Sequence, residues 1–181
     1  MLRRLLTPAL VVVAVCGVAA TAAYAHGDLD KVRRATAAYR SVAVAEQAGY
    51  GKLVDVNGIA CIDMPGMGAM GVHYVNGSLV EDPRIDPLRL EAIVYEPDRA
   101  GHLRIVAVEY VVLTSAWHAR HKAPPALFGH RFNTTASPNR YGLPPFYSLH
   151  AWVWRDNPAG TFAMWNPRVK CPGGGHGSHP H

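Results

Sequence analysis

Residues 91–113 read EAIVYEPDRAGHLRIVAVEYVVL, and this stretch decides the fold. Its two ends, Glu91 to Tyr95 and Leu103 to Leu113, are rich in Val, Ile and Tyr, which favour β-strands. The segment between them, Pro97 to Gly101, has the composition of a turn. The stretch therefore predicts an antiparallel hairpin with one long strand, to which the other elements of the chain are added.

A helix is expected before this hairpin. Asp28 to Gln47 has apolar residues at helical spacing, and Asp28 or Asp30 can cap its first exposed amides. Gly49 and Gly51 follow the last periodic residue and are typical of a helix end. We expect one continuous helix over this range.

Further extended segments lie on both sides of the hairpin. Val72 to Val75 reads as a strand after the Gly-rich segment Pro65 to Gly71, and Tyr147 to Trp154 reads as another. A turn at Asn157 to Gly160 predicts a returning strand at Thr161 to Trp165. Together they predict an α+β fold, with the helix packed on an antiparallel sheet. A small antiparallel β-barrel is the alternative, because the strands are long enough to curl and close.

The N-terminus has the three parts of a secretory signal peptide. Arg3 and Arg4 precede an apolar run from Leu5 to Ala20, and Ala23 to Ala25 supplies the small-x-small cleavage pattern. We therefore expect residues 1–25 to be a signal peptide, residues 26–171 to be a single domain and residues 172–181 to be a flexible Gly/His-rich tail. The expected location is secreted, or the cell envelope and periplasm, with no stable membrane insertion after cleavage.

Composition excludes several classes of function. With 49% hydrophobic and 17% charged residues, the 181-residue chain is not a disordered polypeptide. Loss of Arg3 and Arg4 would lower the formal net charge from +5 to +3, which is too small an excess to indicate nucleic-acid binding. Cleavage would also leave Cys61 and Cys171, which we expect to form a disulfide in an oxidising compartment. The chain lacks the Gly-x-Ser-x-Gly, phosphate-loop, dinucleotide, Cys-x-x-Cys and His-Glu-x-x-His motifs.

Soft and imidazole ligands are the main anomaly of the composition. All ten histidines lie beyond residue 25, and Met64, Met67 and Met70 recur every three residues in a Gly-containing segment that continues to His73. Thioether suits Cu(I), and imidazole suits copper or zinc. This spacing indicates a Met-rich copper site. The alternative is that the methionines fill a gap under a loop, as methionine commonly does.

Three polar residues interrupt apolar strands. His73 lies within Val72 to Val75, and His150 lies between Ser148 and Trp152. Glu109 alternates with apolar residues that we place on the same face of its strand: Leu103, Ile105, Ala107 and Val111. Burial of such groups demands a partner. If the strands are neighbours, the three side chains converge on a metal site or an acid–base pair. The alternative is that Glu109 pairs with an arginine and that each histidine is hydrogen-bonded in the core.

These features lead to one hypothesis and two alternatives. The hypothesis is an exported metal-binding protein that uses His73, Glu109 and His150 with Met64, Met67 and Met70, most readily for copper, with zinc as the second choice. The first alternative is a secreted small-molecule-binding or acid–base enzymatic domain without a metal, and the second is a structural domain of the envelope. The expected partner is a metal ion or a small molecule, and the oligomeric state stays open.

Several phrases of the sequence resemble a group of small exported bacterial proteins with no established activity. They are Gly68 to Asn76, Val108 to Tyr110 and Leu149 to Trp154, the last followed by Asn157-Pro158. The resemblance implies an exported single domain and indicates no particular reaction.

Overall fold

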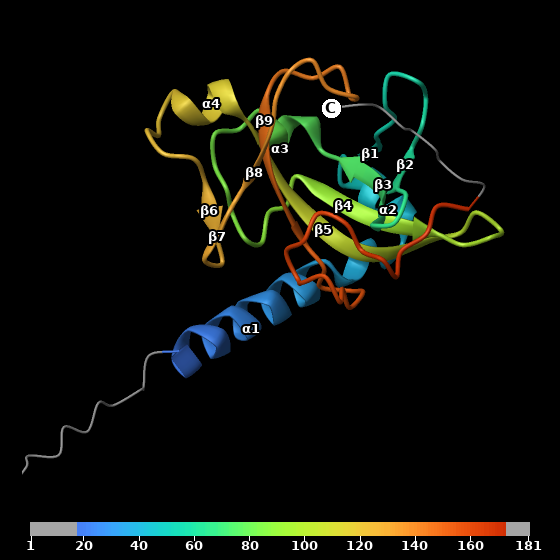
Figure 1. Cartoon of the computed structure of the whole chain (residues 1–181), viewed down its shortest axis with the longest axis horizontal. Coiled ribbons are helices and arrows are strands. Elements are labelled where there is room, and N and C mark those ends of the chain that lie inside the picture. The colour runs from blue at the N-terminus through green and yellow to red at the C-terminus, as the bar shows by residue number, and fades with distance from the viewer. Residues whose placement is uncertain (1–17, 173–181) are drawn as a thin grey trace, which may run out of the picture.

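The computed structural model describes residues 18–172, with helices and a mainly antiparallel sheet (Figure 1). The helices are α1 (Val18–Ala35), η1 (Ala37–Arg40), α2 (Val42–Gln47), α3 (Gly77–Val80) and α4 (Thr114–His118). The strands of the main sheet are β1 (Gly51–Lys52), β2 (Cys61–Met64), β3 (Gly68–Val75), β4 (Ala92–Pro97), β5 (Leu103–Leu113), β8 (Asn133–Thr135) and β9 (Phe146–Ala151). A separate small hairpin consists of β6 (Ala126–Leu127) and β7 (His130–Arg131).

The sheet is open and antiparallel. Its strand order is β1-β3-β4-β5-β9-β8, and β2 pairs with the same strand, β3, as β1 does. The expected hairpin around the turn at Pro97 to Gly101 is therefore confirmed as β4 and β5. Because β1 and β8 end the path without pairing with each other, the described part of the chain forms an α+β fold, and the barrel alternative is not supported.

One face of the sheet, here called the helix face, packs against the N-terminal helices. Val32 and Ala45 from α1 and α2 are completely buried against aromatic and aliphatic side chains of the central strands. These strand residues include Tyr74, Tyr95, Val108, Tyr110 and Leu149. The main hydrophobic core lies in this layer, as the α+β prediction requires.

The predicted helix is broken into three pieces. Thr36 leaves the helix after α1, where its hydroxyl donates to the Val32 carbonyl (2.9 Å) and accepts a hydrogen bond from Trp154 Nε1 (3.0 Å). Ser41 has an extended backbone between η1 and α2, so the helical run restarts there. Asp28 lies inside α1 and does not cap it. The expectation of one continuous helix over Asp28 to Gln47 was wrong, because side-chain bonds to the backbone compete with helical ones at Thr36.

The long strand β5 contains a β-bulge. Val94 pairs with Ala107 and Tyr95 pairs with Ile105, so Val106 is an extra residue on β5. Ile105 consequently packs in the helix-face core, whereas Ala107 lies in a second cluster on the opposite face. The prediction that Leu103 and Ile105 share a face with Glu109 was wrong, because a bulge shifts the alternation of the strand by one residue.

The opposite face of the sheet is crossed by residues 155–171, here called the strap. In the strap, Asn166 exchanges two backbone hydrogen bonds of 3.1 Å with Ala69 of β3. A Cβ at Gly68 would lie 2.1 Å from the Asn166 carbonyl oxygen, so glycine is required where the strap touches the sheet. The predicted returning strand at Thr161 to Trp165 is not formed, and the strap lies across the sheet with few ladder bonds.

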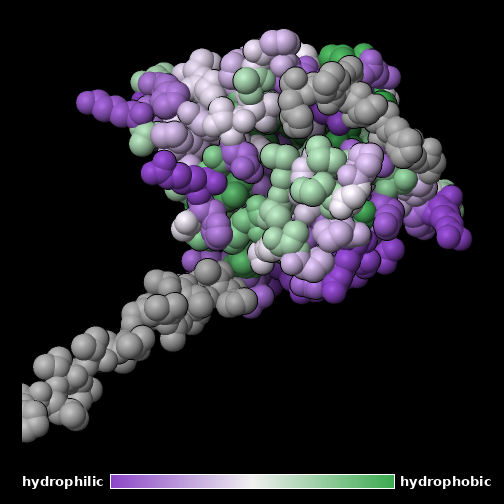
Figure 2. Space-filling model, in the orientation of Figure 1, coloured by the Kyte–Doolittle hydropathy of each residue, from purple (hydrophilic) through white to green (hydrophobic). Residues whose placement is uncertain are grey.

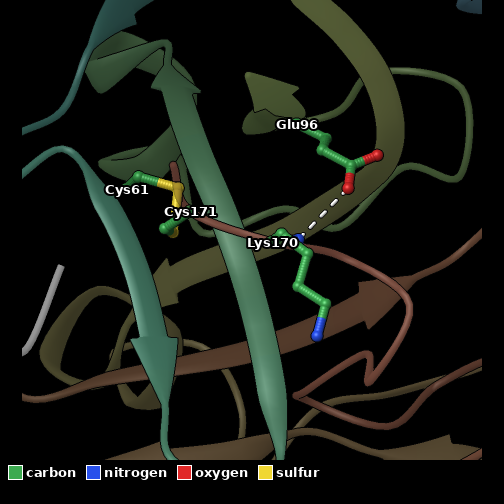
Figure 3. Close-up of a disulfide and its surroundings, with 4 residues drawn as sticks. All are labelled: Cys61, Glu96, Lys170 and Cys171. Carbon is green, nitrogen blue, oxygen red and sulfur yellow. Dashed lines mark hydrogen bonds between the residues drawn. A yellow bond between two sulfur atoms is a disulfide. The ribbon is translucent and has the colours of Figure 1, made fainter. Parts of the chain in front are cut away.

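The strap ends at the expected disulfide. Cys171 is bonded to Cys61 of β2, and the neighbouring Lys170 N–H donates to Glu96 Oε1 of β4 at 3.1 Å (Figure 3). Figure 2 shows hydrophobic residues gathered in the middle of the visible side of the body, with hydrophilic groups around them. Within residues 18–172, no helix combines the length and the apolar character needed to cross a membrane.

Candidate metal centre

His73, Glu109 and His150 meet on the strap side of the sheet. They come from three different strands, β3, β5 and β9, and are 4%, 8% and 1% exposed. Glu109 and His150 are directly opposite each other in the β5–β9 pairing. His73 lies on the far side of β4, and its ring reaches over that strand. The predicted convergence of these three residues is therefore present in the structure.

Ala92 provides the room for this reach. It pairs with Glu109 on one side and with Val75 on the other, and its side chain is completely buried. Val94, two residues further along β4, belongs to the cluster on the strap side, so Ala92 faces the same side. A larger residue at position 92 would occupy the space between His73 and Glu109. Sequence reasoning overlooked Ala92, although alanine is the smallest side chain in the first strand of the hairpin.

The contacts within the cluster are short. His73 Nε2 lies 3.2 Å from His150 Nε2 and 3.4 Å from Glu109 Oε2, and His150 Nδ1 lies 3.2 Å from Glu109 Oε1. The last contact is out of line for a hydrogen bond, so His150 Nδ1 has no hydrogen-bond partner although it is buried. A buried ring nitrogen in this condition is unusual and points to a ligand that completes the site.

Burial keeps both imidazoles neutral. It lowers the pKa of His73 to about 4, against the opposing effect of Glu109 and with a smaller contribution from His150. Burial alone lowers the pKa of His150 to about 4. It also raises the pKa of Glu109, which His73 and a hydrogen bond from Ser148 partly offset. Neutral imidazole is the form that binds a metal, so the histidines are ready to act as ligands near pH 7.

The proton positions in the cluster follow from the same distances. Two neutral imidazoles whose Nε2 atoms face each other can share only one proton. With the proton on His73 Nε2, that N–H faces both His150 Nε2 and Glu109 Oε2, and the His150 proton lies on Nδ1, near Glu109 Oε1 but not aligned with it. Both contacts of His73 Nε2 then join a donor nitrogen and an acceptor. The opposite tautomers would place the His73 Nε2 lone pair against Glu109.

The spacing of the ligand atoms suits a metal ion. Two ligands that are 2.0–2.1 Å from a tetrahedral zinc ion lie about 3.3 Å apart. His73 Nε2 lies close to this separation from His150 Nε2 (3.2 Å) and from Glu109 Oε2 (3.4 Å), whereas the third contact joins other atoms of the two residues, His150 Nδ1 and Glu109 Oε1. His73, Glu109 and His150 could thus hold a metal ion, with one ligand atom each within 4.8 Å of the others. In the described part of the chain, no further Asp, Glu, Cys or His belongs to this group.

The methionines lie elsewhere. Met64 is paired with Gly68 at the far end of the β2–β3 hairpin, and Met67 is half-exposed in its turn. Gly68 is five residues from His73 along β3, which corresponds to about 16 Å. Met70 is buried, but its three residues of separation from His73 correspond to about 10 Å. The structure does not bring these methionines together with the His/Glu cluster, because the segment expected to be a loop is part of a strand.

Two neighbours of the cluster were not selected from the sequence. Ser148 lies two residues before His150 on β9 and hydrogen-bonds to Glu109, as the period-2 alternation of a strand would indicate. The Trp152 ring is stacked on the His150 ring, with centroids 6.0 Å apart and planes at 16°. These contacts fix the orientation of two of the three candidate ligands.

Comparisons with protein-family models, with curated proteins and with solved structures found no match for this chain. The comparisons therefore lend no support to the resemblance to small exported bacterial proteins. A function for this protein must therefore be argued from the geometry of the cluster.

Proposed function

We propose that this protein is an exported metal-binding protein whose site consists of His73, Glu109 and His150, and that the ion is Zn²⁺. The observation that supports this is that three buried residues each offer one ligand atom within 4.8 Å of the others, with His73 Nε2 3.2 Å from His150 Nε2 and 3.4 Å from Glu109 Oε2. Two imidazoles and one carboxylate form a common zinc ligand set. Copper is the second choice, because the thioethers that favoured it are not part of the cluster.

Export is the second part of the proposal. The disulfide between Cys61 and Cys171 supports it, because disulfides persist mainly outside the cytoplasm. The proposed cleavage after Ala25 lies within α1, and residues 1–17 and 173–181 lie outside the described residues. We retain a signal peptide at residues 1–25, a single domain at residues 26–171 and a Gly/His-rich tail at residues 172–181 as parts of this proposal.

An acid–base site without a metal is the second candidate function. His150 Nδ1 and Glu109 Oε1 are 3.2 Å apart, which is close enough for proton transfer once a substrate realigns the two groups. However, both residues are buried, with 8% of Glu109 and 1% of His150 exposed, so a substrate would reach them only after neighbouring residues have moved. A purely structural cluster is disfavoured because His150 Nδ1 has no hydrogen-bond partner.

Metal titration tests the proposal. The three tail histidines, His176, His179 and His181, are replaced by alanine so that they cannot bind the added ion. The protein should then take up one equivalent of zinc, as measured by calorimetry and by metal analysis after desalting. His73→Ala should reduce uptake well below one equivalent.

A matched control distinguishes the site from general histidine binding. His102→Ala removes an exposed histidine that contacts Asp98, and it should bind zinc as the parent does. The proposal fails if the parent binds much less than one equivalent, or if His73→Ala binds as tightly as the parent. A parallel titration with copper ranks the two metals.

A further inference from the structure

The strap is in contact with one of the proposed metal ligands through Trp152. The Trp152 indole N–H donates to the Ala163 carbonyl at 2.6 Å, and its backbone N–H donates to the Thr161 carbonyl at 2.9 Å. On its other side, the Trp152 ring is stacked on His150. Any movement of the strap near Thr161 to Ala163 therefore changes the packing against His150.

The strap is attached to the sheet at several further points. Asn166 is fully buried, bridges to Ala69 of β3, and its side chain bonds to the backbone of Asp156 and Arg168 within the strap. Val169 is also fully buried in the cluster that contains Trp152.

The covalent attachment is at the end of the strap. The disulfide joins Cys171 to Cys61, and the adjacent Lys170 N–H is bonded to Glu96 (Figure 3). Apart from the disulfide, the strap is attached to the sheet only through a few hydrogen bonds and apolar contacts in the described part of the chain. The disulfide is therefore the link whose loss would most increase the opening of the strap, because it removes the covalent limit on the strap's movement.

We propose that the Cys61–Cys171 disulfide regulates metal exchange at the His73/Glu109/His150 site, which rests on the function proposed above. In the oxidised protein, the strap holds Trp152 against His150, so the ion leaves slowly. A small dithiol reduces the disulfide. Two electrons and two protons pass from the dithiol to the protein disulfide, the S–S bond breaks, two cysteine thiols form, and the dithiol becomes a disulfide. The strap then opens more often and the ion leaves faster.

Zinc release measures this effect directly. Zinc-loaded protein without the tail histidines is mixed with an excess of a chromophoric chelator, and the rate of zinc transfer is followed. Two forms of the chain are compared: the oxidised parent and the double variant Cys61→Ser with Cys171→Ser. We expect release at least about tenfold faster from the double variant, because loss of the covalent limit increases the fraction of molecules in which the strap is open.

Two further variants keep the test valid if the double variant folds poorly. Asn166→Ala weakens the strap with the disulfide intact and should also accelerate release. Val112→Ala creates a cavity in the helix-face core, on the side of the sheet opposite the His73/Glu109/His150 cluster, and should lower the melting temperature without changing the release rate. Parent protein reduced by a dithiol, and freed of it without air, should behave as the double variant does.

The outcomes separate the two proposals. If zinc loads at one equivalent but leaves the parent, the double variant and Asn166→Ala at the same rate, the regulatory role is refuted and the metal site stands. It is refuted as well if Val112→Ala accelerates release as much as the loss of the disulfide does. If the parent takes up no zinc in the titration described above, the metal site itself is refuted.

Discussion

Glu91 carries a strong prediction about the pH dependence of stability. It lies immediately before β4 and is 2% exposed, and its Oε2 accepts a hydrogen bond from the Val111 N–H at 3.1 Å. Burial raises its pKa from 4.5 to about 8, although the Val111 bond and Arg89 act in the opposite direction. The carboxyl group is thus neutral in the folded protein at pH 7, but it is ionised in the unfolded chain.

The sign of the effect follows from this difference. Between pH 4.5 and about 8 the folded state holds a proton that the unfolded state has released, so the stability of the folded state falls as the pH rises. The full contribution is present below pH 4.5 and is lost once the pH exceeds about 8. At about 1.4 kcal/mol for each pKa unit, the loss over this window is on the order of 4–5 kcal/mol.

Glu91→Gln should remove this dependence. Glutamine is neutral at every pH and its side-chain carbonyl can accept the Val111 N–H, so the variant keeps the bond without the titration. Urea denaturation of both proteins at pH 5, 7 and 9 gives the free energy of unfolding. We expect the free energy of unfolding of the variant, relative to that of the parent, to rise by about 4 kcal/mol from pH 5 to pH 9.

Comparison of the two proteins isolates Glu91 from its neighbours. Arg89, Asp82 and the other titrating groups are the same in both, so their contributions cancel in the difference between them. The exposed Glu81→Gln serves as the matched control and should show only a small change over the same range. The reasoning is refuted if the difference between Glu91→Gln and the parent stays constant within about 0.5 kcal/mol from pH 5 to pH 9.

Three further predictions concern other parts of the molecule. Ala92→Leu should prevent stoichiometric zinc uptake, because the larger side chain fills the space over β4, and an unchanged zinc titration would contradict the proposed site. The same variant should be less stable than the parent by about 1–3 kcal/mol. Cys61→Ser with Cys171→Ser should lower the free energy of unfolding by about 4–5 kcal/mol, because the bond closes a loop of 110 residues, and a loss below 1 kcal/mol in urea would contradict this. Asp55→Asn should cost about 3–5 kcal/mol by leaving the Arg140 guanidinium, 2.8 Å from the buried carboxylate, without its counter-ion, and a change within 1 kcal/mol of zero would contradict this.

The sequence alone allowed much of the fold to be predicted. The β4–β5 hairpin followed from β-branched residues on both sides of a Pro/Gly-containing turn, and the helix layer followed from the periodicity before Gly49. The bulge at Val106 could not be predicted, because one extra residue in an apolar strand leaves no polar residue out of place. The strap at residues 155–171 was also missed, since its contacts are made mainly by backbone groups and by single buried asparagines.

The candidate site was predictable in its members but not in its arrangement. His73, Glu109 and His150 stood out because each interrupts an apolar strand, and burial requires a partner for such groups. Their proximity depends on the strand order β3-β4-β5-β9, which the sequence does not reveal. Met64 and Met67 were grouped with His73 by their spacing, but Met64 is paired with Gly68, and the extended backbone from Gly68 to His73 turns five residues into about 16 Å of distance.

The bulge at Val106 also divides β5 into two stretches that can vary independently. Leu103 and Ile105 pack toward the helices, whereas residues 107–111 place Glu109 on the opposite face of the sheet, and the extra residue Val106 accounts for the change of face. Deletion of Val106 would move the side chains of residues 103–105 to the other face of the sheet. Glu109 would keep its position, because that part of β5 is paired with both β4 and β9. The hairpin end can therefore change in composition under selection for packing, while the position of the Glu109 carboxylate stays constant.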